Sequence, residues 1–143
     1  MILISHRGNI DGVIKNEENN PSYLNHAMNL GYDVEVDVRY EHEEFYLGHD
    51  FAQYKVEKKF LLNSKVWCHA KTGESLMALK KINAHYFWHQ QDDYTITSKG
   101  YFWTYPNKKL LPQSICVLPE NGNYKEFNCL GICSDFIKRF SND

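Results

Sequence analysis

The sequence lacks an excess of charge of either sign, a long apolar run and any cysteine pair with CxxC spacing. Its 143 residues include 16 Lys and Arg and 18 Asp and Glu, which gives a formal charge of −2. A protein that follows a nucleic-acid backbone needs a basic face, so this balance excludes polymeric nucleic acid as a partner. No apolar stretch approaches the roughly 20 residues that cross a bilayer, so we expect no membrane insertion.

Cysteine usage and the first residues bear on the cellular compartment. The opening segment, Met-Ile-Leu-Ile-Ser-His-Arg-Gly, has too short an apolar run for a secretory leader and predicts a β-strand. We therefore expect a cytoplasmic protein whose four thiols are reduced and buried. The alternative is a zinc site in which Cys129 and Cys133 join Cys68 and His69, although the usual ligand spacing is missing.

Length and composition predict one folded domain. Hydrophobic residues make up 43% of the chain and aromatic residues 15%, so a packed core is expected. The chain is much shorter than the roughly 250 residues of a full eight-unit β/α barrel. It contains no internal repeat, low-complexity tract or linker, so residues 1–143 are predicted to form a single domain.

Strands and helices alternate in the first half of the chain. Residues 2–5 predict a strand, residues 9–20 a polar loop, and residues 20–31 a helix. Strict alternation over residues 32–40 is the clearest strand signal. Shorter strands are predicted at 45–47, 66–70, 84–88, 100–104, 114–118 and 130–133, with one further helix after residue 71. The order predicts an α/β fold, an abbreviated TIM-type β/α barrel with several crossover helices reduced to loops.

Two pairs of side chains on or after predicted strands could carry chemistry. Glu35 and Asp37 are two residues apart on one strand, so their side chains share a face, with Cα atoms roughly 6.6 Å apart. That spacing can hold a divalent cation, although it also fits a solvated strand face. His6 and His49 each follow a predicted strand, where parallel α/β folds place catalytic groups, although a single histidine is more often structural.

Considered together, these segments match a known pattern. His6-Arg7-Gly8, the strand from Gly31 to Val38 and Leu47-Gly48-His49-Asp50 resemble, in order and spacing, the glycerophosphodiester phosphodiesterase family of PLC-like phosphodiesterases. The resemblance implies a TIM barrel, general acid–base catalysis by His6 and His49, and a divalent metal ion bound by Glu35 and Asp37.

The third metal ligand departs from the family pattern. Where the family has Glu-x-Lys, this sequence has His69-Ala70-Lys71. His69 is a candidate ligand and would favour zinc or manganese over calcium or magnesium, which prefer oxygen. It could instead leave a weaker site or donate to phosphate, so the expected cofactor is one divalent ion among Mg, Ca, Mn and Zn. Arg7 and Lys71 are the expected phosphate ligands, since Arg binds two oxygens and Lys supplies a point charge.

Two further segments are candidates for contact with substrate. Asn19 matches an Asn of the family's Glu-Asn-Thr segment and could contact substrate or metal, or it could belong only to the loop before the helix. His89 begins a polar run that suits a substrate loop but equally a solvated turn. Trp88, Trp103 and Tyr105 could form an apolar wall or a platform on which a sugar stacks, although aromatic residues of strands more often lie in the core.

These residues predict an enzyme, a phosphoric diester hydrolase that acts on a small water-soluble diester, either glycerophosphodiester-like or sugar-linked. Water or a substrate hydroxyl could be the attacking group. The alternative is a non-catalytic phosphate-binding or structural module derived from the same fold, which His69 and the short length favour. Missing helices would also leave surfaces that a second copy could cover, so a homo-oligomer is among the expectations.

Overall fold

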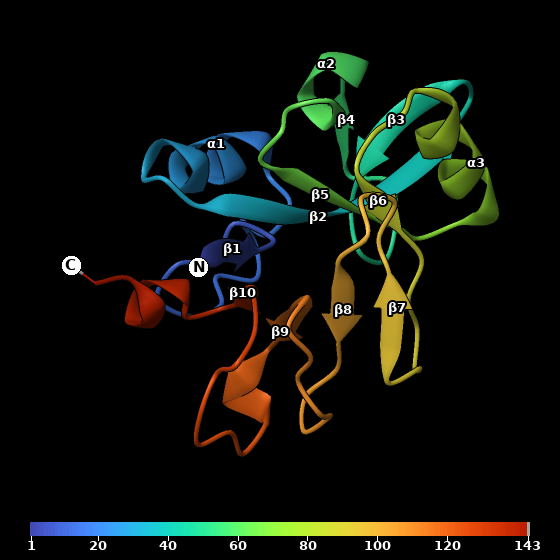
Figure 1. The fold of residues 1–143 in the computed structure, drawn as a ribbon. Helices are drawn as coiled ribbons and strands as arrows, with labels where there is room; N and C mark the ends of the chain where they lie inside the picture. Colours follow the sequence, from blue (N-terminus) through green and yellow to red (C-terminus); the bar gives the residue numbers. More distant parts are fainter. Residues whose placement is uncertain (143) are drawn as a thin grey trace.

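The computed structural model describes residues 1–142, and within them one mixed sheet of ten strands is accompanied by three short α-helices (Figure 1). The strands are β1 (Ile2–His6), β2 (Asp33–Glu41), β3 (Glu44–Leu47), β4 (Tyr54–Val56), β5 (Val66–Ala70), β6 (Tyr86–Phe87), β7 (Tyr94–Ile96), β8 (Phe102–Thr104), β9 (Ser114–Val117) and β10 (Gly131–Ser134). The helices are α1 (Pro21–Asn29), α2 (Lys58–Leu61) and α3 (Gly73–Lys81), with 3-10 helices η1 (Pro119–Asn121) and η2 (Ile137–Phe140). None of these helices combines the length and the apolar character needed to cross a membrane.

Seven strands form the parallel part of the sheet, in the order β6-β5-β2-β1-β10-β9-β8. The long strand β2 pairs with β5 over its first half and with the antiparallel strand β3 over its second half. Strand β4 continues that ribbon, and β7 pairs antiparallel with β8. The carboxyl ends of the parallel strands therefore lie at one edge of the sheet.

The predicted TIM-type β/α barrel is wrong. The sheet is mixed, the α-helices span only nine, four and nine residues, and within residues 1–142 no strand pairing joins β6 to β8. Such a barrel needs a crossover helix between successive parallel strands. The connection from β8 to β9 is Tyr-Pro-Asn-Lys-Lys-Leu-Leu-Pro-Gln, whose two prolines and short length exclude a helix.

Most of the predicted elements are present, with altered limits. The predicted strand at 32–40 is β2, and the predicted helix at 20–31 is α1, where the Asn20 side chain accepts a hydrogen bond from the Ser22 N–H at 3.1 Å. The strand predicted at 84–88 is only the two-residue β6. The sequence did not predict β4, β7 or α2, all of which are four residues or shorter.

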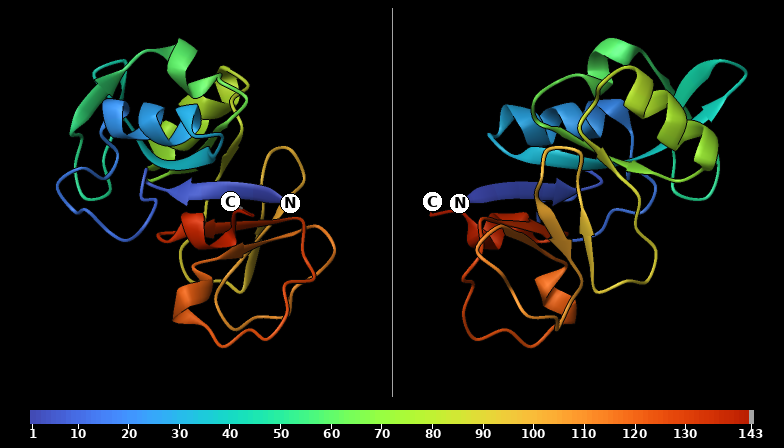
Figure 2. Two further views of the ribbon diagram at one scale, coloured as in Figure 1. Left: turned by 90° about the vertical axis from the view of Figure 1, so that its left-hand side faces the viewer. Right: turned by 45° about the vertical axis from the view of Figure 1, so that its right-hand side comes forward.

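Apolar side chains are buried on both faces of the sheet. Three valines of β2 pack with α1 and α3 on one face. On the other face, Trp67 of β5, Phe87 of β6 and Trp103 of β8 form one cluster, with the Phe87 and Trp103 ring centroids 4.5 Å apart. Because these rings come from distant strands, the sheet must curl around them, and Figure 2 shows the helices on one side of β1 and strands β8–β10 on the other.

Candidate active site

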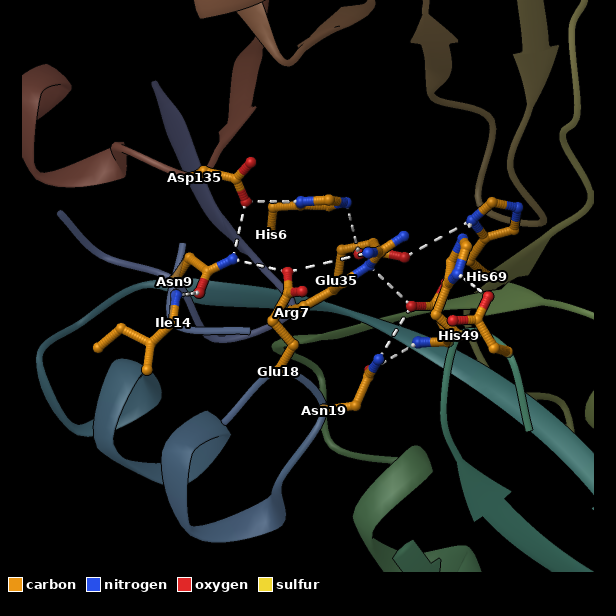
Figure 3. A network of polar contacts seen from close by, with 12 residues as sticks. His6, Arg7, Asn9, Ile14, Glu18, Asn19, Glu35, His49, His69 and Asp135 are labelled. Carbon is orange, nitrogen blue, oxygen red and sulfur yellow. Dashed lines mark hydrogen bonds and ion pairs between the residues drawn. The ribbon is translucent and has the colours of Figure 1, made fainter. Parts of the chain in front are cut away.

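Strand β2 places two carboxylates on the inner face of the curled sheet. Glu35 is 1% exposed and Asp37 is fully buried, and both alternate with the valines that face the helices. In the strand register, Glu35 lies beside His6 of β1 and Asp37 beside His69 of β5. Parallel pairing therefore brings four residues from three strands together, and Figure 3 labels His6, Glu35 and His69 among them.

Asp37 is held by two residues of the loops around it. The Asn19 side-chain amide donates to Asp37 Oδ2 at 2.9 Å, and the Asp37 backbone N–H donates to Asn19 Oδ1 at 3.0 Å. Arg7 Nε lies 2.8 Å from the same Oδ2, as an ion pair outside hydrogen-bond geometry. Burial alone would raise the pKa of Asp37, but Arg7, together with His69 and Asn19, lowers it below its usual range. Asp37 is therefore an anion with its second oxygen, Oδ1, facing the site.

Backbone strain accompanies this arrangement. Arg7 has a φ of 56° and Asn19 a φ of 66°, which are left-handed conformations that residues other than glycine rarely adopt. The Asn19 N–H donates to the Arg7 carbonyl at 3.0 Å, and the Arg7 N–H donates to the Glu35 carbonyl at 3.0 Å. These bonds hold the two strained residues against β2, in keeping with the concentration of such strain at functional sites.

The tautomer of His69 is set by the main chain. His69 Nε2 lies 2.8 Å from the backbone oxygen of His89, so this nitrogen carries the proton and donates it. The lone pair of the neutral ring is then on Nδ1. Nδ1 lies 3.6 Å from Glu35 Oε1 and 3.8 Å from Asp37 Oδ1. A histidine whose other nitrogen donates to a carbonyl is the usual form of a metal ligand.

These donors fit a divalent cation. Within residues 1–142, both oxygens of Glu35 and Oδ1 of Asp37 are buried without a hydrogen-bond partner, which is costly for carboxylates. Two ligands of a tetrahedral zinc, each about 2.1 Å from the metal, lie about 3.4 Å apart. The spacings of 3.6 and 3.8 Å around His69 Nδ1 are close to that value. Glu35, Asp37 and His69, the three ligands expected from the sequence, therefore form one candidate metal centre.

The cysteines lie elsewhere. Cys68 and Cys133 are fully buried, and burial raises the pKa of both thiols. Among residues 1–142, two clusters have the geometry to hold a metal, and neither contains a cysteine. The structure therefore gives no support to the alternative of a cysteine zinc site.

His6 is oriented by a carboxylate. Its Nδ1 lies 2.7 Å from Oδ1 of Asp135, the residue that directly follows β10. The side-chain amide of Asn9 donates to the same oxygen at 2.8 Å. Its Nε2 lies 3.6 Å from Glu35 Oε2. Burial lowers the pKa of His6, but the Asp135 hydrogen bond and the Glu35 charge outweigh burial and raise it above the usual value. Asp135 thus holds the ring so that Nε2 is the nitrogen presented for proton transfer.

His49 lies on the turn between β3 and β4. Its side chain is 45% exposed, and its Nδ1 lies 2.8 Å from Asp50 Oδ1. Arg39 donates to the backbone oxygens of Gly48 and His49 at 3.0 and 2.6 Å, which anchors the turn to β2. The ring of His49 is therefore much less enclosed than that of His6, although its main chain is fixed.

One cavity of about 270 Å³ opens onto these groups. The residues lining it that the sequence indicates as site residues are His6, Arg7, Glu35, His49, His69, Lys71 and His89. Trp103 and Tyr105 also line it, whereas Trp88 does not. Asn19 and Asp37 are buried and do not line this cavity. Asp37 acts on the cavity through its ion pair with Arg7 and through the candidate metal centre. Two cationic side chains, two candidate acid–base groups and the metal donors Glu35 and His69 thus line one cavity.

Part of this network is not evident from the sequence. Asp135 and Asn9 are absent from the predicted site, and Glu18 enters it only as the neighbour of Asn19. Asn9 donates to Glu18 Oε2 at 2.9 Å, and Glu18 lies 3.8 Å from Arg7 Nη1. A signal for Asp135 exists, because it lies within two residues of the end of a predicted strand, as His6 and His49 do.

Comparison with known proteins identifies no relative. No protein-family model matches the chain, and no curated protein or solved structure is significantly similar to it. The function therefore has to be argued from the site.

Proposed function

We propose that this protein is a metal-dependent phosphodiesterase that hydrolyses small, water-soluble diesters. The observation that carries the proposal is the buried set of unpartnered oxygens on Glu35 and Asp37, which faces His69 Nδ1 next to the cavity that His6, Glu35 and His69 line. The proposal retains the chemistry implied by the sequence resemblance but not the barrel.

Each part of diester cleavage has a candidate group in the cavity. A divalent ion at Glu35, Asp37 and His69 would supply Lewis-acid stabilisation of the phosphoryl oxygens. Arg7 and Lys71 add positive charge against the same oxygens. One histidine of the pair His6 and His49 accepts the proton of the attacking hydroxyl or water, and the other protonates the departing alkoxide. The P–O bond to the new oxygen forms as the bond to the leaving alcohol breaks.

Turnover of bis(p-nitrophenyl) phosphate with Mg, Ca, Mn, Zn or Co tests this proposal. We expect nitrophenol release that depends on the metal and is lost in the variant, His6→Ala or His49→Ala, that lacks the base. Both variants should lose turnover of a glycerophosphodiester, whose alkoxide needs a proton, whereas nitrophenolate leaves without one. His26→Ala, whose histidine is exposed on α1, should keep both activities. If the wild type turns over neither bis(p-nitrophenyl) phosphate nor a glycerophosphodiester faster than the two site variants do, the proposal of an enzyme is rejected. Phosphate binding without turnover would instead support the non-catalytic module.

His69→Glu is expected to change the metal preference. The variant places three carboxylates around the cation, so we expect the activity ratio of Mg²⁺ or Ca²⁺ to Zn²⁺ to rise by about tenfold or more. His69→Ala should lower activity with every metal. Parallel metal titrations of turnover measure this ratio, and an unchanged metal profile in His69→Glu would remove His69 from the ligand set.

Gly48→Ala is expected to displace His49. A Cβ at this position would lie in severe clash with the Phe51 backbone oxygen, 1.9 Å away, so the turn must rearrange. We expect diester turnover to fall by about tenfold or more, while Zn²⁺ affinity is retained because the turn holds no ligand. Steady-state kinetics and zinc titration test this, with Gly73→Ala as control, because a Cβ there meets open space. Full turnover in Gly48→Ala would show that the placement of His49 is unimportant.

A further inference from the structure

Asn9, on the loop after β1, is fully buried beside the candidate active site. Its side-chain nitrogen donates to Asp135 Oδ1 at 2.8 Å and to Glu18 Oε2 at 2.9 Å (Figure 3). Its side-chain oxygen accepts from the Ile14 N–H at 3.2 Å and from the Tyr23 hydroxyl at 3.0 Å. These bonds use every donor and acceptor position of a carboxamide. The carboxylates only accept and the Ile14 N–H only donates, so the orientation of the amide is fixed.

The main chain of Asn9 is also tied to the strand that carries His6. The Asn9 N–H donates to the His6 carbonyl at 3.0 Å, and the Ser5 hydroxyl donates to the Asn9 carbonyl oxygen at 2.8 Å. Gly8, which precedes Asn9, has a φ of 95°, and a Cβ there would lie only 2.5 Å from Tyr23 Cδ1. The Tyr23 ring therefore packs directly against the turn that carries Asn9.

A continuous chain of side-chain contacts thus links helix α1 to a candidate acid–base group. The Tyr23 hydroxyl donates to the Asn9 amide, and the Asn9 amide donates to Asp135 Oδ1. The same Asp135 oxygen lies 2.7 Å from His6 Nδ1. The middle of this chain requires an uncharged donor, because a cation there would offset the negative charge that Asp135 presents to His6. An apolar side chain would leave Asp135 without this donor, so an amide suits the position.

The other carboxylate that Asn9 binds has a smaller part in the site. Glu18 Oε2 lies 3.8 Å from Arg7 Nη1, whereas Arg7 Nε lies 2.8 Å from the buried Asp37. Arg7 is therefore held chiefly by Asp37, and loss of the Asn9 side chain is expected to act through Asp135.

We infer that Asn9 is a positioning residue for His6: it holds the Asp135 carboxylate against His6 Nδ1, and Tyr23 of α1 fixes the Asn9 amide in turn. The effect on turnover rests on the proposed function. Neither Asn9 nor Tyr23 lines the active-site cavity or belongs to the candidate metal centre. Their substitution should therefore act on proton transfer and leave the metal donors in place.

NMR of the histidine rings tests the inference without turnover. The proton on His6 Nδ1 gives a resonance that is absent in His6→Gln, and its rate of exchange with water measures how firmly its hydrogen bond is held. We expect this exchange to accelerate by about tenfold or more in Asn9→Ala and by about threefold in Tyr23→Phe, which loses one hydrogen bond. Tyr32→Phe is the matched control and should leave the exchange unchanged, because the Tyr32 hydroxyl donates to Ser141 Oγ at 3.5 Å and lies outside this chain of contacts.

Steady-state kinetics with a glycerophosphodiester separate this inference from the proposed function. In Asn9→Ala we expect kcat to fall by about tenfold or more, and KM and Zn²⁺ affinity to change less than kcat does. If the wild type cleaves no diester, the proposed function fails, and faster proton exchange in the two variants would still show that Asn9 positions His6. Unchanged exchange in both variants overturns the inference even if turnover falls, because the loss would then come from the loop as a whole. Faster exchange with an unchanged kcat overturns it as well. If Asn9→Ala does not fold, Tyr23→Phe decides by the same measurements.

Discussion

Glu35→Gln is expected to abolish metal-dependent turnover and, at the same time, to stabilise the metal-free protein. Changes to groups that only support a metal ligand lower metal affinity by about 10–100-fold, so loss of a ligand charge should lower it by about 100-fold or more. In the metal-free protein, both Glu35 oxygens are buried without a hydrogen-bond partner in the described part of the chain. A neutral amide is cheaper to bury, so the free energy of unfolding should rise by about 1–3 kcal/mol.

The two opposite effects make this variant diagnostic. Urea denaturation with and without Zn²⁺ measures stability, and titration calorimetry measures affinity. Glu41→Gln, at the exposed end of the same strand, is the matched control and should change neither quantity. If Glu35→Gln destabilises the metal-free protein, the carboxylate has a structural partner that outweighs its burial. If Zn²⁺ affinity is unchanged, Glu35 is not a ligand.

The sequence alone predicts those site residues whose place depends on the alternation or the end of a strand. Alternation over residues 32–40 placed Glu35 and Asp37 on one face, and the structure confirms that arrangement. The ends of two predicted strands placed His6 and His49, which line the same cavity. Such features depend on local periodicity, which a single sequence carries.

The rest depends on contacts distant in sequence. His6 contacts Asp135, 129 residues away in the sequence, because β1 pairs with β10. No sequence pattern near His6 indicates that partner. Asn19 reaches Asp37 only because its left-handed backbone turns the loop back onto β2. The barrel prediction failed for the same reason, because strand order and the antiparallel ribbon of β3 and β4 are set by tertiary pairing.

His6→Gln is expected to separate proton transfer from metal binding. Glutamine keeps a polar side chain beside Asp135 but cannot exchange a proton, so diester turnover should fall by about 10²–10⁴-fold. Zn²⁺ affinity should fall less than turnover does, because the proposed ligands Glu35, Asp37 and His69 remain and His6 is only a neighbour of Glu35 Oε2. Asp135→Asn should lower turnover less, because it removes the charge that orients His6 and leaves the imidazole in place.

The pH dependence distinguishes a proton-transfer role for His6 from a structural one. The Asp135 hydrogen bond and the Glu35 charge raise the pKa of His6 above its usual value, and Asp135→Asn removes the first of these effects. The pH profile of kcat/KM should therefore lose the limb that titrates with His6 in His6→Gln, and this limb should move toward lower pH in Asp135→Asn. Equal losses of Zn²⁺ affinity and turnover in His6→Gln would instead show that His6 serves the metal centre. Phosphodiester cleavage would then need another base, and His49, exposed and paired with Asp50, is the group that the cavity offers.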